Sequence, residues 1–186
     1  MIGSTTSARL AQVWVAVSQR GLITVEFSVC REDFEASVRR QVHGDLQPAH
    51  GRAQQVLSQA TSEIGEYLAG RRRTFGVPID WSILTSDFQR LALRAVSAIP
   101  YGETRTYGEI AAKIGYPQAP RAVGRANATN PMPLVIPCHR VIGSDGKLHG
   151  YGGAGGLKTK QWLLDLEGAD SRLEKATAGI RLPITW

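Results

Sequence analysis

The chain has 186 residues, a length that fits one domain or two small ones and excludes a large multidomain assembly. Its 42% apolar and 20% charged residues are enough to bury a core, which excludes a disordered chain. No uncharged stretch approaches the ~20 residues of a membrane-spanning helix, and the first residues lack the pattern of a secretory signal. We therefore expect a globular cytoplasmic protein that does not enter a membrane.

The positive charge is concentrated in one part of the sequence. The chain carries a net charge of +6, and residues 88–160 alone carry +7 while the rest carries −1. A basic excess of this kind indicates a polyanionic partner, because a positively charged surface attracts negative charge. It says nothing about the fold. We expect residues 88–160 to contain the surface that binds such a partner.

The first part of the chain predicts a small α/β unit. Strands over 10–17 and 22–29 flank a short turn at 18–21, helices follow over 32–42 and 52–69, and 75–81 is a plausible last strand. The predicted boundary near Leu84 gives a scaffold domain over 1–84, a second domain over 85–168 and a tail over 169–186. The run Arg71–Arg73 is open to two interpretations, a solvated loop or a nucleic-acid contact.

The second part of the chain predicts several short helices. A capping box at Ser86 opens a helix whose inward residues are predicted to be Phe88, Leu91, Ala92, Ala95, Val96 and Ile99. A second capping box, Thr106–Glu109, opens a short helix that Gly115 ends, and another helix follows over 121–128. Two short helices around a tight turn in a basic region favour a helix-turn-helix, and an ordinary helical hairpin is the alternative.

Residues 130–142 have the composition of a reactive site. Three prolines are expected to hold this segment extended. Within it Cys138 stands beside His139 and Arg140, whose positive charge favours the nucleophilic thiolate. The alternative is an inert, buried cysteine. We expect Cys138 to be the reactive thiol and Cys30, the other cysteine, to lie in the core.

A candidate partner for the imidazole lies far along the chain. Adjacent side chains of an extended segment point to opposite faces, so His139 can act on Cys138 only through a kink or a water. Glu167 stands in the last turn of a helix predicted over 157–166, where a carboxylate opposes the helix dipole. We expect it to orient the imidazole, the alternative being an exposed surface glutamate.

The glycine-rich segment 150–155 matches GxGxxG, with Asp170 twenty residues after its first glycine. The βαβ context of a dinucleotide site is missing, so a flexible pocket wall carrying Tyr151 is the better interpretation. Four scattered histidines and two distant cysteines give no metal-ligand spacing. We predict neither a metal nor a cofactor.

Taken together, these motifs resemble one family, the O6-alkylguanine-DNA alkyltransferases, also called methylated-DNA–protein-cysteine methyltransferases. In the first half the likeness is looser and rests on the hairpin and on Tyr67–Gly70. In the second half it is specific and rests on Ile99–Thr104, Tyr107–Ala111, Arg121–Gly124, Asn130–Pro131, Pro137–Val141, Leu163–Leu164 and Glu167–Gly168.

The resemblance implies an α+β fold. A small N-terminal α/β domain of the ribonuclease H-like type, with an antiparallel sheet, would precede a mainly helical, winged-helix-like domain with a helix-turn-helix. It also implies direct reversal of DNA damage. The alkyl group of O6-alkylguanine in double-stranded DNA, and of O4-alkylthymine, would pass once and irreversibly to Cys138 after base flipping. The free protein would be a monomer, and cooperative binding to DNA is left open.

Catalytic roles follow from the same resemblance. Cys138 would accept the alkyl group, and His139 would be the base, acting through a water while Glu167 holds its other nitrogen. Asn130 would tie the helix-turn-helix to the active-site segment. Tyr107 would help the guanine to leave and crowd the phosphate that rotates during base flipping.

The resemblance also assigns the contacts with DNA and with the base. Arg121 would fill the space left by the flipped nucleotide, and the expected DNA contacts are Arg121, Tyr107, Ala122, Gly124, Arg125 and Asn127. The base would lie against Cys138, Val141, Tyr151 and Gly152. Gly152 replaces a serine of some relatives, and the loop to Gly156 is about two residues longer, so the range of alkyl groups is open.

Three other functions compete with this one. A non-catalytic protein that flags lesions would lack the cysteine, so the presence of Cys138 argues against it. A helix-turn-helix regulator would bind one defined sequence of undamaged DNA. A thiol hydrolase using Cys138 and His139 would turn over an ester repeatedly.

Overall fold

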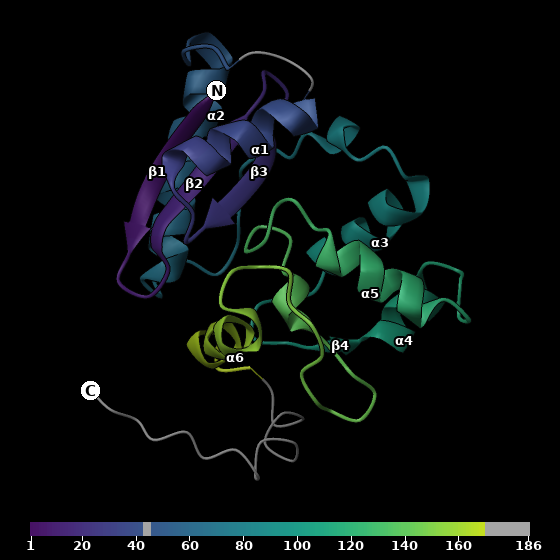
Figure 1. Ribbon diagram of the computed structural model, residues 1–186. Coiled ribbons are helices and arrows are strands. Elements are labelled where there is room, and N and C mark those ends of the chain that lie inside the picture. The colour runs from purple at the N-terminus through teal and green to yellow at the C-terminus, as the bar shows by residue number, and fades with distance from the viewer. Residues whose placement is uncertain (43–45, 170–186) are drawn as a thin grey trace.

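The computed structural model describes residues 1–42 and 46–169, and all of the predicted tail except Ala169 lies outside the described residues. Its first half is a three-stranded antiparallel sheet in the order β1-β2-β3 (Figure 1). The elements of this half are β1 (Ile2–Ser7), β2 (Ala11–Val17), β3 (Leu22–Phe27), α1 (Arg31–Val42) and α2 (Gly51–Leu68). The predicted hairpin is confirmed, with Val15 opposite Val25.

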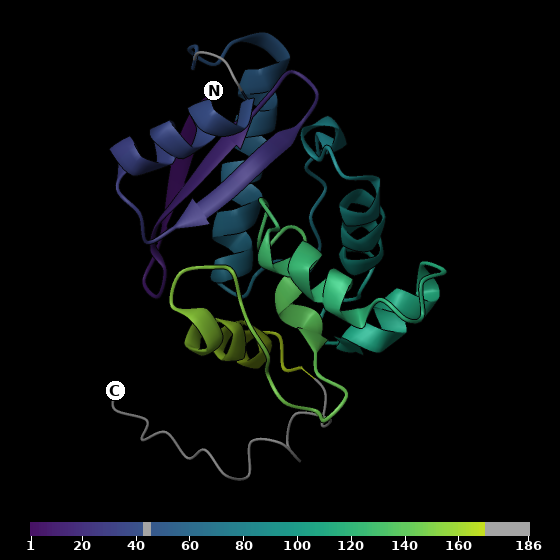
Figure 2. The same ribbon diagram turned by 45° about the vertical axis from the view of Figure 1, so that its right-hand side comes forward.

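Both faces of the sheet are buried because helices cover each of them (Figures 1 and 2). Val13 and Val15 of β2 belong to the main core with α2, whereas Ala16 packs with Phe34 and Val38 of α1. Alternate side chains of a strand point to opposite faces, so an apolar run such as β2 serves both helices. The first strand was not predicted, since its sequence, IGSTTS, is mostly polar and small.

The prediction of a strand over 75–81 is wrong. Only an isolated bridge joins Leu22 to Ile79, and a 3₁₀ turn, η1 (Trp81–Ile83), follows. The Pro78 carbonyl accepts the Leu22 N–H at 2.7 Å. Pro78 itself has no N–H to donate, which prevents a continuous ladder of hydrogen bonds at this point. The segment therefore runs beside the sheet without extending it.

The second half is mainly helical and surrounds a short parallel pair of strands. Its elements are α3 (Asp87–Ser97), β4 (Arg105–Thr106), α4 (Tyr107–Lys113), α5 (Pro120–Ala128), η2 (Cys138–Arg140), β5 (Val141–Ile142) and α6 (Gly156–Leu166). Thr106 and Glu109 form the predicted capping box in both directions. Gly115 follows α4 with a φ of 83°, so α4 and α5 are the two short helices expected around a tight turn.

The buried face of α3 differs in part from its prediction. Leu91 was predicted to point inward and is 41% exposed, while Leu93 is fully buried. The buried stripe is centred on Ala92 and Val96 and extends toward Leu93, which leaves Leu91 beyond its edge. Ser86 caps the helix as predicted, by accepting the Gln89 N–H.

The two halves meet through a continuous core and through backbone hydrogen bonds. The carbonyl oxygen of Pro131 accepts the Val25 N–H and the Thr24 hydroxyl, each at 2.8 Å. The edge of β3 is thereby fixed against the segment that leads to Cys138. Among the described residues, no helix is both long and apolar enough to cross a membrane.

Candidate active site

The segment before Cys138 is folded rather than extended, so that prediction is wrong. The Asn130 amide donates to the Ile136 carbonyl at 2.9 Å, and its oxygen accepts the Met132 N–H at 3.0 Å. Leu134 sits in the left-handed region with a φ of 75°, a conformation that costs about 1–3 kcal/mol and persists only where surrounding packing enforces it. Asn130 thus closes a compact loop that delivers Cys138 to a tight turn.

That turn, η2, sends His139 toward the C-terminal end of α6. Its Nε2 lies 2.9 Å from Oε1 of Glu167, and both side chains are fully buried. Glu167 caps α6, so its carboxylate reaches inward at the point where the chain leaves the helix. The structure therefore brings together the histidine and the glutamate that the sequence paired.

Glu167 receives more donors than the sequence indicated. The Arg140 guanidinium binds both of its oxygens, at 2.8 and 2.9 Å, and the Gly102 N–H donates at 3.1 Å. Burial raises the pKa of this carboxyl, but the hydrogen bonds and charges of His139 and Arg140 outweigh it and bring the pKa down to about 2. Glu167 is therefore a buried, permanently ionised carboxylate.

Tyr67 joins this network from the other half of the molecule. Its hydroxyl donates to Glu167 at 2.6 Å and lies 3.3 Å from Nε2 of His139. Burial is the main reason that the pKa of Tyr67 is raised well above 10, so the group stays a donor. This role was not predicted from the sequence, in which Tyr67 served only as part of the Tyr67–Gly70 motif.

His139 is positioned as a neutral base. Burial lowers its pKa below 6.5 even though Glu167 opposes this effect. With Nε2 facing Glu167, the proton belongs on Nε2, and Nδ1 is an acceptor that has no partner among the described residues.

Cys138 is 5% exposed, and its surroundings differ from the expectation. Burial raises the pKa of the thiol, and a hydrogen bond from Asn130, the charge of Lys160 and nearby backbone N–H groups offset this only in part. Arg140 does not supply the positive charge, since its donors go to Glu167 and to the Ile99 carbonyl. At neutral pH the resting group is a thiol that needs a base.

Lys160 is the cation whose charge lowers the pKa of the Cys138 thiol. Its role was not predicted from the sequence. It is fully buried on α6, and its Nζ donates to the carbonyls of Val141 at 2.6 Å, His149 at 3.0 Å and Gly150 at 3.3 Å. Burial lowers its pKa to about 8. A signal was available, because a lysine three and four residues before the apolar Leu163 and Leu164 lies on the inward face of the helix.

Of the residues expected around the base, Tyr107 and Val141 are hydrogen-bonded to other groups of the protein, and Tyr151 is not. The Tyr107 hydroxyl donates to the His149 carbonyl at 3.0 Å, and the Val141 carbonyl accepts from Lys160. The Tyr151 hydroxyl is buried and has no partner among the described residues. Burial and the nearby Cys138 raise the pKa of both tyrosines, so both remain protonated donors.

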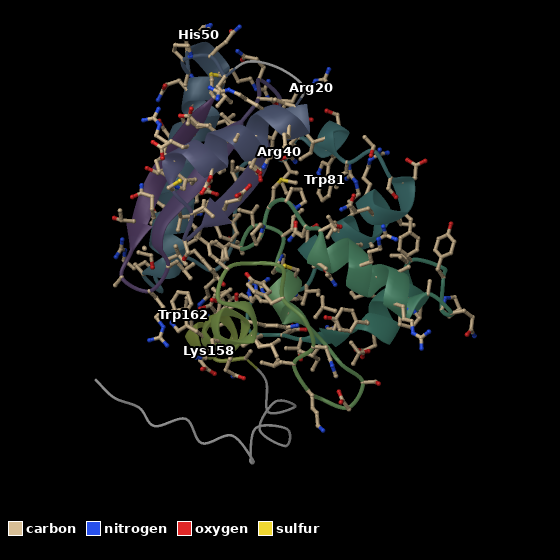
Figure 3. All side chains as sticks on the ribbon, in the orientation of Figure 1. Arg20, Arg40, His50, Trp81, Lys158 and Trp162 are labelled. Carbon is tan, nitrogen blue, oxygen red and sulfur yellow. The ribbon has the colours of Figure 1, made fainter. Side chains whose placement is uncertain are left out.

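A cavity of about 540 Å³ opens beside Cys138. On one side it is walled by β3 and α1, including Arg40, which Figure 3 labels, and on the other by residues 127–133 and 152–154. The glycine-rich segment is thus a pocket wall, but Tyr151, which was predicted to be part of this wall, does not line the cavity. A Cβ at Gly152 would collide with the carbonyl oxygen of Ala128, so a larger residue here would require the backbone to shift.

Two family models match the chain in succession. Residues 2–81 match the ribonuclease-like domain of 6-O-methylguanine DNA methyltransferase, and residues 87–169 match its DNA-binding domain. The chain belongs to this family. The order of the two matched domains fits the predicted α+β fold, with a sheet in the first half and a helix-turn-helix in the second.

Relatives and solved structures agree with this membership. A methylated-DNA–protein-cysteine methyltransferase of Mycolicibacterium paratuberculosis is 56% identical over 112 residues, which span 60% of this chain and 66% of that protein. A constitutive enzyme of the same name from Bacillus subtilis is 45% identical over the same shares of the two chains. The crystal structure of Mycobacterium tuberculosis OGT in complex with DNA is 36% identical with a TM-score of 0.72, covering 92% of this chain and 96% of that one.

Most of the expected DNA contacts of this family member lie on one exposed face of α5. Arg121, Ala122 and Arg125 are exposed and Gly124 is half-buried beneath the Tyr107 ring. Asn127 is the exception, because it is only 6% exposed and lines the cavity beside Cys138, and its expected contact with DNA stays a prediction. It lies on the opposite side of the helix from Arg125, two residues away.

Two further expectations are changed by the structure. Cys30 is exposed at the start of α1, where its Sγ accepts the Asp33 N–H at 3.4 Å, so its predicted core position is wrong. In the basic run, Arg72 pairs with Glu66 at 2.7 Å and Arg73 lies over the Tyr101 ring at 5.5 Å. Within residues 1–42 and 46–169, no group of three or more His, Cys, Asp or Glu side chains could hold a metal ion.

Proposed function

We propose that this protein repairs O6-alkylguanine in duplex DNA by moving the alkyl group once to Cys138. The observation that carries the proposal is the placement of Cys138 between an open cavity and a buried His139 whose far nitrogen faces Glu167. This is the arrangement of an activated nucleophile, in which a third group fixes the tautomer of the base. Residues 85–168 would carry DNA binding and transfer, with 1–84 as their scaffold and the free protein a monomer.

The reaction is a displacement at carbon. His139 takes the thiol proton through a water, and the Sγ of Cys138 attacks the first carbon of the alkyl group in line with the C–O6 bond. A C–S bond forms, the C–O6 bond breaks, and its electron pair goes to the guanine, which takes up one proton. The product is a thioether and an unmodified guanine. The reverse step would have to expel a thiolate from an unactivated thioether, which is unfavourable, so the protein acts once.

Tyr107 and Lys160 supply donors to the departing guanine in this proposal. Both now donate to the His149 carbonyl, at 3.0 Å each. Guanine presents acceptors of the same kind, so a flipped base can exchange with this carbonyl. Negative charge develops on the base as the C–O6 bond breaks, and donors aimed at that charge lower the barrier.

Binding would place α5 in the minor groove, with Arg121 in the space left by the flipped nucleotide. The exposed positions of Arg121, Ala122 and Arg125 support this orientation. Damage has no fixed sequence context, so phosphate contacts from the basic half supply most of the affinity. Binding should therefore weaken steeply as salt is raised.

The test is a mass measurement on the intact protein after incubation with a duplex that holds one O6-methylguanine. One retained methyl group on Cys138, and no more than one equivalent of repaired base, is the expected result. Cys138→Ser should gain nothing, while Cys30→Ser, which alters the exposed thiol, should gain one methyl group. An unmodified protein, or repeated turnover without retained mass, would refute the proposal.

A second duplex extends the test to the wider substrate range. O4-methylthymine in the same sequence context should also add one methyl group to Cys138. Absence of that gain would restrict the proposal to guanine. Sedimentation of the free protein measures its mass and tests whether it is a monomer. Titration of a duplex with the protein tests whether binding to DNA is cooperative.

A further inference from the structure

Asn127 has an unusual environment for a buried polar side chain. It lies in the last turns of α5, is 6% exposed, and neither its Nδ2 nor its Oδ1 has a partner among the described residues. Each buried amide group without a partner costs about 1–3 kcal/mol. Among the described residues, Thr104, His139 and Tyr151 also have a buried polar atom without a partner, but none of these three lines the cavity beside Cys138, as Asn127 does. A ligand in the cavity would satisfy both of its groups.

Reaction geometry indicates which part of the substrate reaches this cavity. An in-line displacement places Sγ, the first alkyl carbon and O6 in one row, so the rest of the alkyl group must project sideways from the thiol. Of the residues that we assign to the base, Cys138 and Gly152 line the cavity, whereas Tyr107, Val141 and Tyr151 do not. At about 540 Å³ the cavity is also far larger than a methyl group requires. It is therefore the space for the remainder of the alkyl group.

The walls of this space are mixed in character. Val25, Phe27 and Pro133 provide apolar surface, and the Asn127 amide provides a neutral donor and acceptor. A hydroxyl on the second alkyl carbon offers the complementary donor and acceptor. An apolar group of the same size leaves the amide unpaired, and sites that hold such polar groups reject the analogue that lacks them.

We propose that Asn127 is a specificity-determining residue that favours O6-substituents with a hydroxyl on the second carbon over apolar substituents of equal size. This inference rests on the proposed transfer to Cys138 and names the substrate class that the site prefers. The matched pair is O6-(2-hydroxyethyl)guanine and O6-n-propylguanine, which differ by a hydroxyl in place of a methyl group.

The experiment measures single-turnover transfer rates for both lesions in one duplex sequence. The two alkyl groups differ in intrinsic reactivity, so the readout is the hydroxyethyl-to-propyl rate ratio of each variant relative to that of the natural protein. Asn127→Leu keeps a similar shape without polar atoms and should lower the ratio about tenfold, as the loss of one or two hydrogen bonds implies. An unchanged ratio in this variant would overturn the inference.

Two further variants keep the result interpretable. Thr129→Val changes another residue of the cavity wall whose hydroxyl is already bonded to the Arg125 carbonyl and to Gln89, and it should keep the natural ratio. Asn127→Ala replaces the Leu variant if that protein does not fold, and should lower the ratio in the same way. A fall of equal size in Thr129→Val would assign the effect to the wall in general and refute the role of Asn127.

O6-methylguanine in the same duplex separates this inference from the proposed function. If the natural protein does not transfer the methyl group to Cys138, the function itself fails. If methyl transfer occurs and the hydroxyethyl-to-propyl rate ratio is the same in Asn127→Leu as in the natural protein, only the inference on Asn127 fails.

Discussion

The two halves of the molecule contribute unequally to the site. Residues after Leu84 supply Cys138, His139, Glu167 and Lys160, and this half also holds the basic excess. The half before it supplies one hydroxyl, that of Tyr67, and one wall of the cavity. The N-terminal half is therefore more than a scaffold, and its contribution to the site should be small and measurable.

Glu167 is the point at which the two contributions can be compared. It accepts hydrogen bonds from Arg140, His139, Gly102 and Tyr67, of which the last alone comes from the N-terminal half. Where several donors bind one buried carboxylate, removing one donor should destabilise the protein less than removing the carboxylate. Removing the carboxylate and removing each donor should therefore give graded effects.

The largest effect is expected from Glu167→Gln. The change leaves the Arg140 charge buried without its counter-ion, which should lower the free energy of unfolding by about 3–5 kcal/mol. It also removes the group that fixes the His139 tautomer, so single-turnover methyl transfer should fall about 100-fold. Urea unfolding and a quench-flow transfer assay measure the two losses.

Glu66→Gln is the matched control for that variant. Glu66 pairs with Arg72 on the partly exposed surface of α2, at 2.7 Å. Loss of such a solvent-exposed pair should change stability little and leave transfer intact. Equal losses in the two variants would show that Glu167 has no special position.

Acid should reproduce part of the Glu167 effect. Its pKa falls from 4.5 to about 2 on folding. The stabilisation is complete above pH 4.5 and is lost as pH drops toward 2, because the unfolded chain binds the proton first. Its size is about 3 kcal/mol. The stability difference between the natural protein and Glu167→Gln should therefore shrink between pH 4.5 and 2, and a constant difference would contradict the assignment.

A smaller effect is expected from Lys160→Met, which removes a buried charge within the C-terminal half. The charge of Lys160 lowers the pKa of Cys138, so its loss should raise that pKa further. A higher pKa leaves less thiolate near pH 7, so transfer there should be several-fold slower and should recover in part as pH increases. Rates of Cys138 alkylation against pH provide the measurement.

Lys158→Met serves as the control for Lys160, since Lys158 is an exposed lysine on the same helix (Figure 3). Its replacement should leave the alkylation profile of Cys138 in place. A shift of the same size in both variants would mean that net charge, and not the buried position of Lys160, sets the reactivity of the thiol.

The sequence predicted local structure well where a local interaction decides it. The capping box at Thr106, the stop at Gly115 and the α2 helix depend on neighbours within one or two turns, and each is as predicted. The strand over 75–81 and the extended segment before Cys138 were wrong. Both depend on which distant group takes the backbone hydrogen bonds, as Asn130 does for Ile136.

The candidate site divides in the same way. Glu167 was found from the sequence because its place at a helix C-terminus conflicts with the dipole, a local signal. Tyr67 is 72 residues from His139, and nothing in its own segment reveals the partner. The buried position of Asn127 was not predicted, because helical periodicity alone does not say which side of a short helix meets the core.

The smallest effect is expected from Tyr67→Phe, which cuts the one hydrogen bond from the N-terminal half to Glu167. The carboxylate keeps Arg140, His139 and Gly102, so stability should fall by about 1 kcal/mol and transfer several-fold. Tyr101→Phe is the control, because it removes a comparable bond, to the Leu166 carbonyl at 3.0 Å, without touching Glu167 or His139. Transfer that falls in the first variant and holds in the second would establish Tyr67 as a positioning residue. Equal behaviour of the two would return the N-terminal half to a purely structural role, since only the bond to Glu167 distinguishes them.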